Sequence, residues 1–267
     1  MNEIEYDGAI KSEARILRGL WLRMAHAIIN VEMQQMRNLI VILSAALFTA
    51  CSGLPGRMSD AELKASNNVA VVSLLGDRFY FVRVGTTVFN NVNYEFHVPD
   101  WNIDSMVESV VVERLSEDGA RKVSTLEHTP GISSRFRDSW SLFNNGFSYD
   151  EIFSLAKEQG YNALIAVEPT PYDNQPFHVA GYGFYERNFL GNSSRCIYTL
   201  FTINVYSIDD RSTLGWDWGF PCTGGETEIP WKAQISEYSV EELKSLRERT
   251  EENISTSVLS TLDSLGY

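Results

Sequence analysis

The residues with the most distinctive chemistry are cysteines, and two of them flank a predicted hairpin. Cys196 opens the hairpin 196–218, and Cys222 follows it. A bulge at Gly219 or Pro221 would bring the two side chains together. An even pair of thiols in an oxidising compartment predicts a disulfide, and the alternative is two separate buried thiols. No Cys-x-x-Cys motif or pair of histidines accompanies them, so we expect no metal site.

The third cysteine, Cys51, ends an apolar run at residues 39–48 that only Ser44 interrupts. This run is too short to cross a bilayer, which takes about 20 residues. Arg37 lies just before it, and the small residues 49–50 follow it. A positive start, a short apolar middle and a small-residue exit are typical of a secretory signal peptide.

Residues 48–51 read Phe-Thr-Ala-Cys and resemble the lipobox of bacterial lipoproteins, with Phe48 where the family prefers leucine. The resemblance implies that Cys51 is the first mature residue and that it carries two or three acyl chains, palmitate among them. Ser52 stands where an aspartate would resemble the signal for retention in the inner membrane. The resemblance therefore points to the outer membrane, with the rest of the chain facing the periplasm.

The signal peptide divides the chain. Residues 1–35 precede better start sites, so we interpret them as an over-long gene start. The alternative is that residues 1–50 form an amphipathic helix followed by a buried one. Residues 36–50 are then the signal peptide, 51–67 a flexible tether and 68–267 a single domain.

Other residue types offer little chemistry. A net charge of −13 argues against nucleic acid as a partner. No nucleophile elbow, dinucleotide loop or calcium motif is present, so we predict no catalytic residue and no cofactor. We expect His97, His128 and His178 to be solvated, and Ser133-Ser134 to lie in a flexible surface loop rather than in an anion site.

Aromatic residues crowd one predicted loop, 171–194. Tyr, Trp and Arg are favoured anchors at protein interfaces, so we predict that this loop contacts a protein partner. The alternative is that these side chains pack within the loop. The residues predicted to bind the partner are Phe177, Tyr182, Phe184, Tyr185, Arg187 and Phe189.

Periodic patterns predict the elements that position these residues. Besides the hairpin, strands are expected at 69–75, 78–84, 92–98, 122–126 and 161–167. Helices are expected at 103–115, from a capping box at Ser148 to Gly160, and from a second box at Ser239 to 262. Strict β-α-β alternation is missing. We therefore predict an α+β domain with two to three helices on one face of a largely antiparallel sheet.

The segment EIFSLAKEQGYNALIAVEP at 151–169, followed by a strand pair with an acidic turn and a terminal amphipathic helix, suggests a family. It is similar to envelope lipoproteins of the curli-secretion and penicillin-binding-protein-activator kind, whose domain resembles the amino-terminal domain of TolB. We predict a non-enzymatic lipid-anchored protein that binds or organises other envelope components, with the loops 128–147 and 171–194 as its contact surface. One alternative is a periplasmic hydrolase with scattered acidic residues, which requires carboxylates converging on a hollow. Another is a subunit of a secretion or pore assembly that inserts residues 78–98.

Overall fold

Eight strands and five α-helices form the part of the chain that the structure, a computed structural model, describes. That part comprises residues 56–117, 119–129, 131–138, 149–170, 179–189, 192–219, 222 and 229–267. The strands are β1 (Asn68–Ser73), β2 (Arg78–Val84), β3 (Val92–His97), β4 (Lys122–Thr125), β5 (Ala163–Pro169), β6 (Gly181–Phe189), β7 (Asn192–Ser207) and β8 (Thr213–Gly219). The helices are α2 (Asp60–Ala65), α3 (Ile103–Ser116), α4 (Ile132–Asp138), α5 (Tyr149–Glu158) and α6 (Val240–Leu265), with short 3-10 helices η1 (Val88–Asn90), η2 (Pro99–Trp101) and η3 (Ile235–Glu237). The predicted signal peptide and Cys51 lie outside the described residues.

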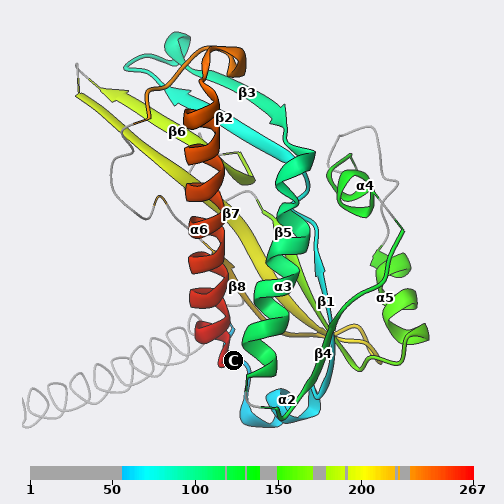
Figure 1. The fold of residues 1–267 in the computed structure, drawn as a ribbon. Coiled ribbons are helices and arrows are strands. Elements are labelled where there is room, and N and C mark those ends of the chain that lie inside the picture. Colours follow the sequence, from blue (N-terminus) through cyan, green and yellow to red (C-terminus); the bar gives the residue numbers. More distant parts are fainter. Residues whose placement is uncertain are drawn as a thin grey trace, which may run out of the picture. The chain divides into compact units, whose positions relative to one another are not determined.

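One long strand, β7, runs through the whole sheet (Figure 1). Residues 192–200 of β7 pair with β6, whereas residues 201–207 pair with β5. Strand β8 pairs with residues 201–206 as the second arm of the predicted hairpin. Strands β2 and β3 complete the β6 half of the sheet, and β1 and β4 complete the β5 half. The sheet therefore has two halves that share β7.

The β5 half has a parallel centre. Strand β1 pairs in parallel with both β4 and β5, and helices lie in the connections between them. Every residue of β5 and all but the first of β1 are buried. Such unbroken apolar runs are typical of strands covered on both faces.

The two faces of the sheet carry different helices. On one face, Val69 and Val71 pack with apolar residues of α3 and α6 in the main core, against which Leu63 of α2 also packs. On the other face, Ala70 and Val72 pack with residues of α4 and α5. Figure 1 shows α3 and α6 side by side, with α4 and α5 away from them. The predicted α+β class is confirmed, but the helices do not all lie on one face: the predicted helix α5 and the unpredicted helix α4 cover the second face.

Helix α6 begins as predicted. Its N-cap is Ser239, whose hydroxyl accepts from the Glu242 N–H while the Glu242 carboxylate accepts from the Ser239 N–H. Its buried stripe includes Leu246, Ile254, Val258 and Leu262. Among the described residues, no helix is both long and apolar enough to span a membrane.

The folded body begins earlier than predicted. Gly56 forms a β-bridge with Trp216, and Met58 is buried. The next residues form α2, which starts with a capping box between Ser59 and Glu62. The tether prediction therefore fails for residues 56–67, because backbone pairing and one buried methionine hold a segment whose composition is polar.

Residues 181–189, predicted to belong to a loop, form strand β6. Two glycines and several polar residues suggested a loop, but Tyr182 and Phe184 alternate with Gly183 and Tyr185 as strand residues do. Residues 78–98, on which the pore alternative rested, supply β2 and β3 of the same sheet half.

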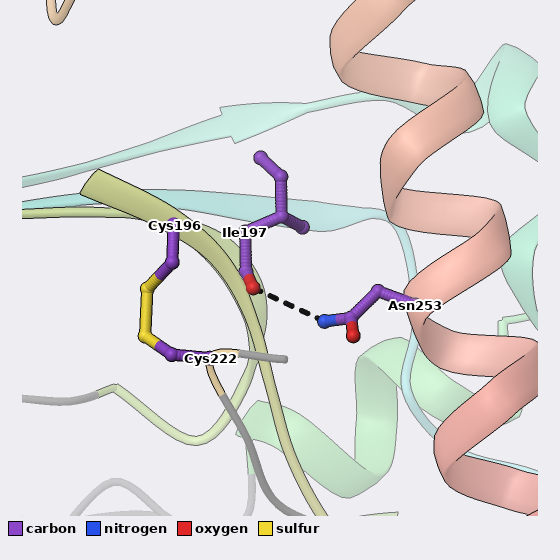
Figure 2. The surroundings of a disulfide bond; sticks show 4 residues. All are labelled: Cys196, Ile197, Cys222 and Asn253. Carbon is purple, nitrogen blue, oxygen red and sulfur yellow. Dashed lines mark hydrogen bonds between the residues drawn. A yellow bond between two sulfur atoms is a disulfide. The ribbon is translucent and has the colours of Figure 1, made fainter. Parts of the chain in front are cut away.

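The predicted disulfide joins Cys196 of β7 to Cys222, with the two Cα atoms 5.4 Å apart (Figure 2). The register between β7 and β8 shifts at Val205/Tyr206 rather than at Gly219. Closing a loop with 26 residues of separation stabilises a fold by about 3 to 4 kcal/mol in the chain-entropy model. The bond fixes the chain beyond β8 to the β6 half of the sheet.

Gly183 offers a test of the packing between β2, β6 and β7. A Cβ at Gly183 would overlap the Tyr80 carbonyl oxygen and lie 2.9 Å from the Tyr198 ring. Gly183→Ala should therefore lower the free energy of unfolding by about 3 kcal/mol, measured by urea denaturation. Gly56→Ala is the control, because its added Cβ meets nothing closer than 4.0 Å. Equal stability of Gly183→Ala and the wild type would contradict this packing.

Candidate functional site

Polar side chains meet where the parallel strands β1 and β4 end. Ser73 is the last residue of β1, and His128 follows the end of β4. Asp104 and Glu108 lie four residues apart on α3 and so face the same side of that helix. In sheets with parallel strands, the carboxyl ends of the strands are the usual place for a ligand crevice. We call Ser73, Asp104, Glu108, His128 and Ser133 the strand-end cluster.

Asp104 is the centre of the strand-end cluster. Its Oδ1 accepts from the Ser73 hydroxyl at 2.6 Å and from the Gly76 N–H at 3.0 Å. Its Oδ2 accepts from the Ser133 hydroxyl at 2.6 Å. Burial raises the pKa of the Asp104 carboxyl, the three donors oppose that rise, and the nearby Glu108 adds to it. One carboxyl thus joins β1, the turn after it and α4 to the start of α3.

Glu108 and His128 form the second part of the strand-end cluster. The buried Glu108 accepts from the Ser73 N–H at 3.0 Å, and its Oε1 lies 3.9 Å from His128 Nε2. The other ring nitrogen of His128 lies 3.1 Å from the Thr129 carbonyl oxygen. The neighbouring Glu108 carboxylate is the main reason why the pKa of His128 is raised. The protonated ring can donate to the Thr129 carbonyl oxygen, and its charge pairs with the Glu108 carboxylate.

Helix α4 is held against the cluster by a second buried residue, Arg137. Its guanidinium donates to the Tyr80 hydroxyl at 2.9 Å, to the Ala180 carbonyl at 2.9 Å and to the Leu75 carbonyl at 3.1 Å. Burial lowers the pKa of Arg137. Because these bonds reach both β2 and the start of β6, Arg137 keeps α4, and with it Ser133, in place.

A hollow of about 210 Å³ opens beside Asp104. Its lining mixes polar and apolar groups and includes the start of α3 and the start of α4. The lining residues are Gly76, Asp77, Pro99, Asn102, Ile103, Asp104, Ser105, Gly131, Ser133 and Ser134. The hollow is large enough for a small polar molecule or several waters.

The cluster can hold and share protons, but it does not form a serine nucleophile with a histidine base. Among the described residues, no hydrogen bond joins Ser73 or Ser133 to His128, and both hydroxyls donate to Asp104 instead. In the same part of the chain, no group of three or more His, Cys, Asp and Glu residues could hold a metal ion. The arrangement is that of two carboxyl groups, Asp104 and Glu108, that hold β1, α3 and α4 together beside a histidine.

The predicted partner-binding residues differ in how far they are exposed to solvent. Tyr182 and Phe184 are fully buried in the main core, and the Tyr182 hydroxyl donates to the Gly76 carbonyl at 2.8 Å. Those two predictions are wrong, because alternate residues of β6 point into the core. Tyr185 is half-buried and Arg187 is exposed. Phe177 and the side chain of Phe189 lie outside the described residues.

The histidine and serine predictions are corrected in part. His97 is solvated as expected, with 62% of its side chain exposed. His128 is not, because 22% of its side chain is exposed and Glu108 lies beside it. Ser133 lies on α4 rather than in a loop and donates to a carboxylate, so it does not form an anion site. His178 lies outside the described residues.

One sequence signal could have found the strand-end cluster. Glu108 stands four residues after Asp104, and it follows Val107 in a helix whose apolar positions define a buried face. A carboxylate on or next to a buried face must find a partner. Its partners Ser73 and His128 are distant in sequence, and nothing local identifies them.

The comparisons with known proteins add little. No protein-family model matches this chain, and no curated protein matches its sequence. A solved structure, the LpoB C-terminal domain from Salmonella enterica, is similar at a TM-score of 0.25 and 7% identity. The match covers 66% of this chain and 89% of that one. At this TM-score the likeness carries no argument about function.

The raised pKa of Asp104 predicts how stability depends on pH. The folded chain keeps a proton that the unfolded chain releases from about pH 4 upward, so stability falls as the pH rises through the folded pKa. Asp104→Asn cannot release a proton, so this fall should disappear from its urea unfolding curves between pH 4 and 8. Asp100→Asn, which changes an exposed carboxylate, is the control. An unchanged slope in Asp104→Asn would refute the assignment.

The raised pKa of His128 makes a separate prediction. A protonated His128 stabilises the fold below about pH 6.5, and this stabilisation is lost as the pH rises through the raised folded pKa. His128→Gln should therefore cost about 1 kcal/mol at pH 6 and much less at pH 9. Chemical denaturation at both pH values measures the difference, with the exposed His97→Gln as the control. The same loss at both pH values would show that charge plays no part.

Proposed function

We propose that this chain is a lipid-anchored outer-membrane protein whose periplasmic domain binds or organises other envelope components without catalysis. The observation that carries the proposal is the Cys196–Cys222 disulfide. Structural disulfides persist in oxidising compartments such as the periplasm and are rare in the cytosol. The signal-peptide pattern that ends at Cys51 supports the same compartment.

The proposed anchor limits where the folded body can lie. Four residues separate Cys51 from Gly56, so the five Cα-to-Cα steps between them reach at most about 18 Å. Gly56 pairs with Trp216, and the Met58 N–H donates to the carbonyl of Leu265 at the end of α6. A lipid on Cys51 would therefore keep the C-terminal end of α6 close to the membrane surface.

The opposite end of the domain is the better surface for a partner. Helix α6 has 26 residues and so extends about 39 Å from Leu265 to its start. Near that start, the connection between β2 and β3 presents Phe89, which is 93% exposed, and α6 itself presents Val240, which is 78% exposed (Figure 1). Phe89 and Val240 are the two most exposed large apolar side chains among the described residues, so we place the proposed partner surface at this end of the domain.

One observation favours the hydrolase alternative. Asp77 and Asp104 both line the hollow beside the strand-end cluster, and this alternative requires converging carboxylates. The hydrogen bonds of Asp104 to Ser73, Gly76 and Ser133 favour a structural role instead, because they occupy both carboxylate oxygens. The non-enzymatic proposal is therefore preferred.

Replacement of the proposed lipid site tests the anchor. Cys51→Ser should move the protein from the outer-membrane fraction to the soluble periplasmic fraction, and globomycin should block maturation of the wild type. Intact mass should show a mature chain that begins at Cys51 and carries its acyl chains.

The matched control is Cys222→Ser, which removes a thiol but leaves the anchor site. It should lose the disulfide and still fractionate with the outer membrane. A wild-type chain found in the cytosol with residues 1–50 attached and an unmodified Cys51 would rule out the proposal.

A further inference from the structure

A buried glutamate lies between two arginines in the β6 half of the sheet. Glu186 of β6 is 1% exposed and stands opposite Arg83 of β2 on one side and Arg195 of β7 on the other. The Arg83 Nε lies 2.8 Å from Glu186 Oε2, and the Arg195 Nε donates to Oε1 at 2.8 Å. The Ser193 hydroxyl also donates to Oε1 at 2.9 Å.

These three side chains share the face of the sheet that carries the main core. Phe81, Phe184 and Ile197, each two residues away on the same strands, belong to that core. Because alternate strand residues share a face, the charged row is the next row beyond the apolar one. The backbone of three paired strands therefore fixes where both arginines begin.

The guanidinium groups of Arg83 and Arg195 are held in place, but they keep N–H donors that Glu186 does not use. Each one contacts Glu186 through its Nε, and among the described residues the Nη atoms of Arg83 and Arg195 make no hydrogen bond. The two side chains are 36% and 32% exposed. Trp231 stacks against the Arg83 head at 4.8 Å and further limits its motion.

The group also carries an unbalanced charge. One carboxylate faces two guanidinium groups, which leaves a local charge of +1 on a chain whose net charge is −13. Two contacts to the same carboxylate hold the two Nε atoms within about 8 Å of each other. At that separation, the Nη atoms of both arginines are close enough to contact a single ligand group.

We propose that Arg83 and Arg195 form a binding site for an oxyanion, either a carboxylate or a phosphate group, which their Nη atoms contact together. Arginine heads bind both groups with paired, charge-assisted hydrogen bonds. Glu186 acts as the positioning residue, since it fixes both heads before a ligand arrives and so lowers the entropy lost on binding. The site does not depend on the lipid anchor or on the strand-end cluster.

Anion titration of the full chain tests the site. The probes are inorganic phosphate and acetate, each added against chloride at constant ionic strength and pH, with isothermal titration calorimetry as the measurement. The wild type should bind at least one of them saturably, and the preferred probe identifies phosphate or carboxylate as the ligand class. Arg83→Gln and Arg195→Gln should each weaken binding about tenfold or more.

The matched control is Arg247→Gln, which removes an arginine that is 42% exposed and also pairs with a single glutamate, Glu251. It should bind the probe as the wild type does. If an arginine variant folds poorly, the Nε–Hε resonances of Arg83 and Arg195 in the wild type give a second readout and should shift with the preferred anion. No saturable binding, or equal binding in all variants, would overturn the proposal, and neither outcome bears on the lipid anchor.

Discussion

The pairing along β7 is the interaction on which the rest of the structure depends. Its first part holds β6, and through β6 it holds β2 and β3. Its second part holds β5 and β8, and through β5 it holds β1 and β4. No other strand among the described residues joins the two halves as a continuous element. If the pairing register of β7 slipped by one residue, every β7 side chain would move to the opposite face of the sheet, in both halves at once.

Two polar contacts fix the position of helix α6 along β7. Asn253 of α6 donates to the carbonyl of Ile197 at 3.1 Å, next to the disulfide at Cys196 (Figure 2). Thr199, buried on β7, donates to Ser257 one turn further along α6 at 3.1 Å. Buried polar groups need partners in fixed places, so these two bonds select one position of α6 on β7 where apolar packing alone would allow several.

Elements with strong local patterns were predictable from sequence, whereas contacts between distant residues were not. The apolar run of β1, the capping box of α6 and the disulfide follow from composition, spacing and cysteine number. Strand β6 was missed because Gly181 and Gly183 suggest a loop, yet close contact with β2 requires a residue without a Cβ at Gly183. The strand-end cluster was missed because the partners of Asp104 come from three separate elements.

The carboxylates of Asp104 and Glu186 differ in the groups that contact them, and this difference separates a structural site from a proposed binding site. Asp104 accepts from hydroxyls and a backbone N–H, which are neutral groups fully occupied by the contact. Glu186 is paired with two arginines, each of which has further N–H donors on its Nη atoms. A carboxylate that is bound by neutral donors leaves no positive charge and no further donors for a ligand. A carboxylate bound by two arginines leaves positive charge and fixed donors at the surface, so the β6 half of the sheet is where an anionic ligand is best recognised.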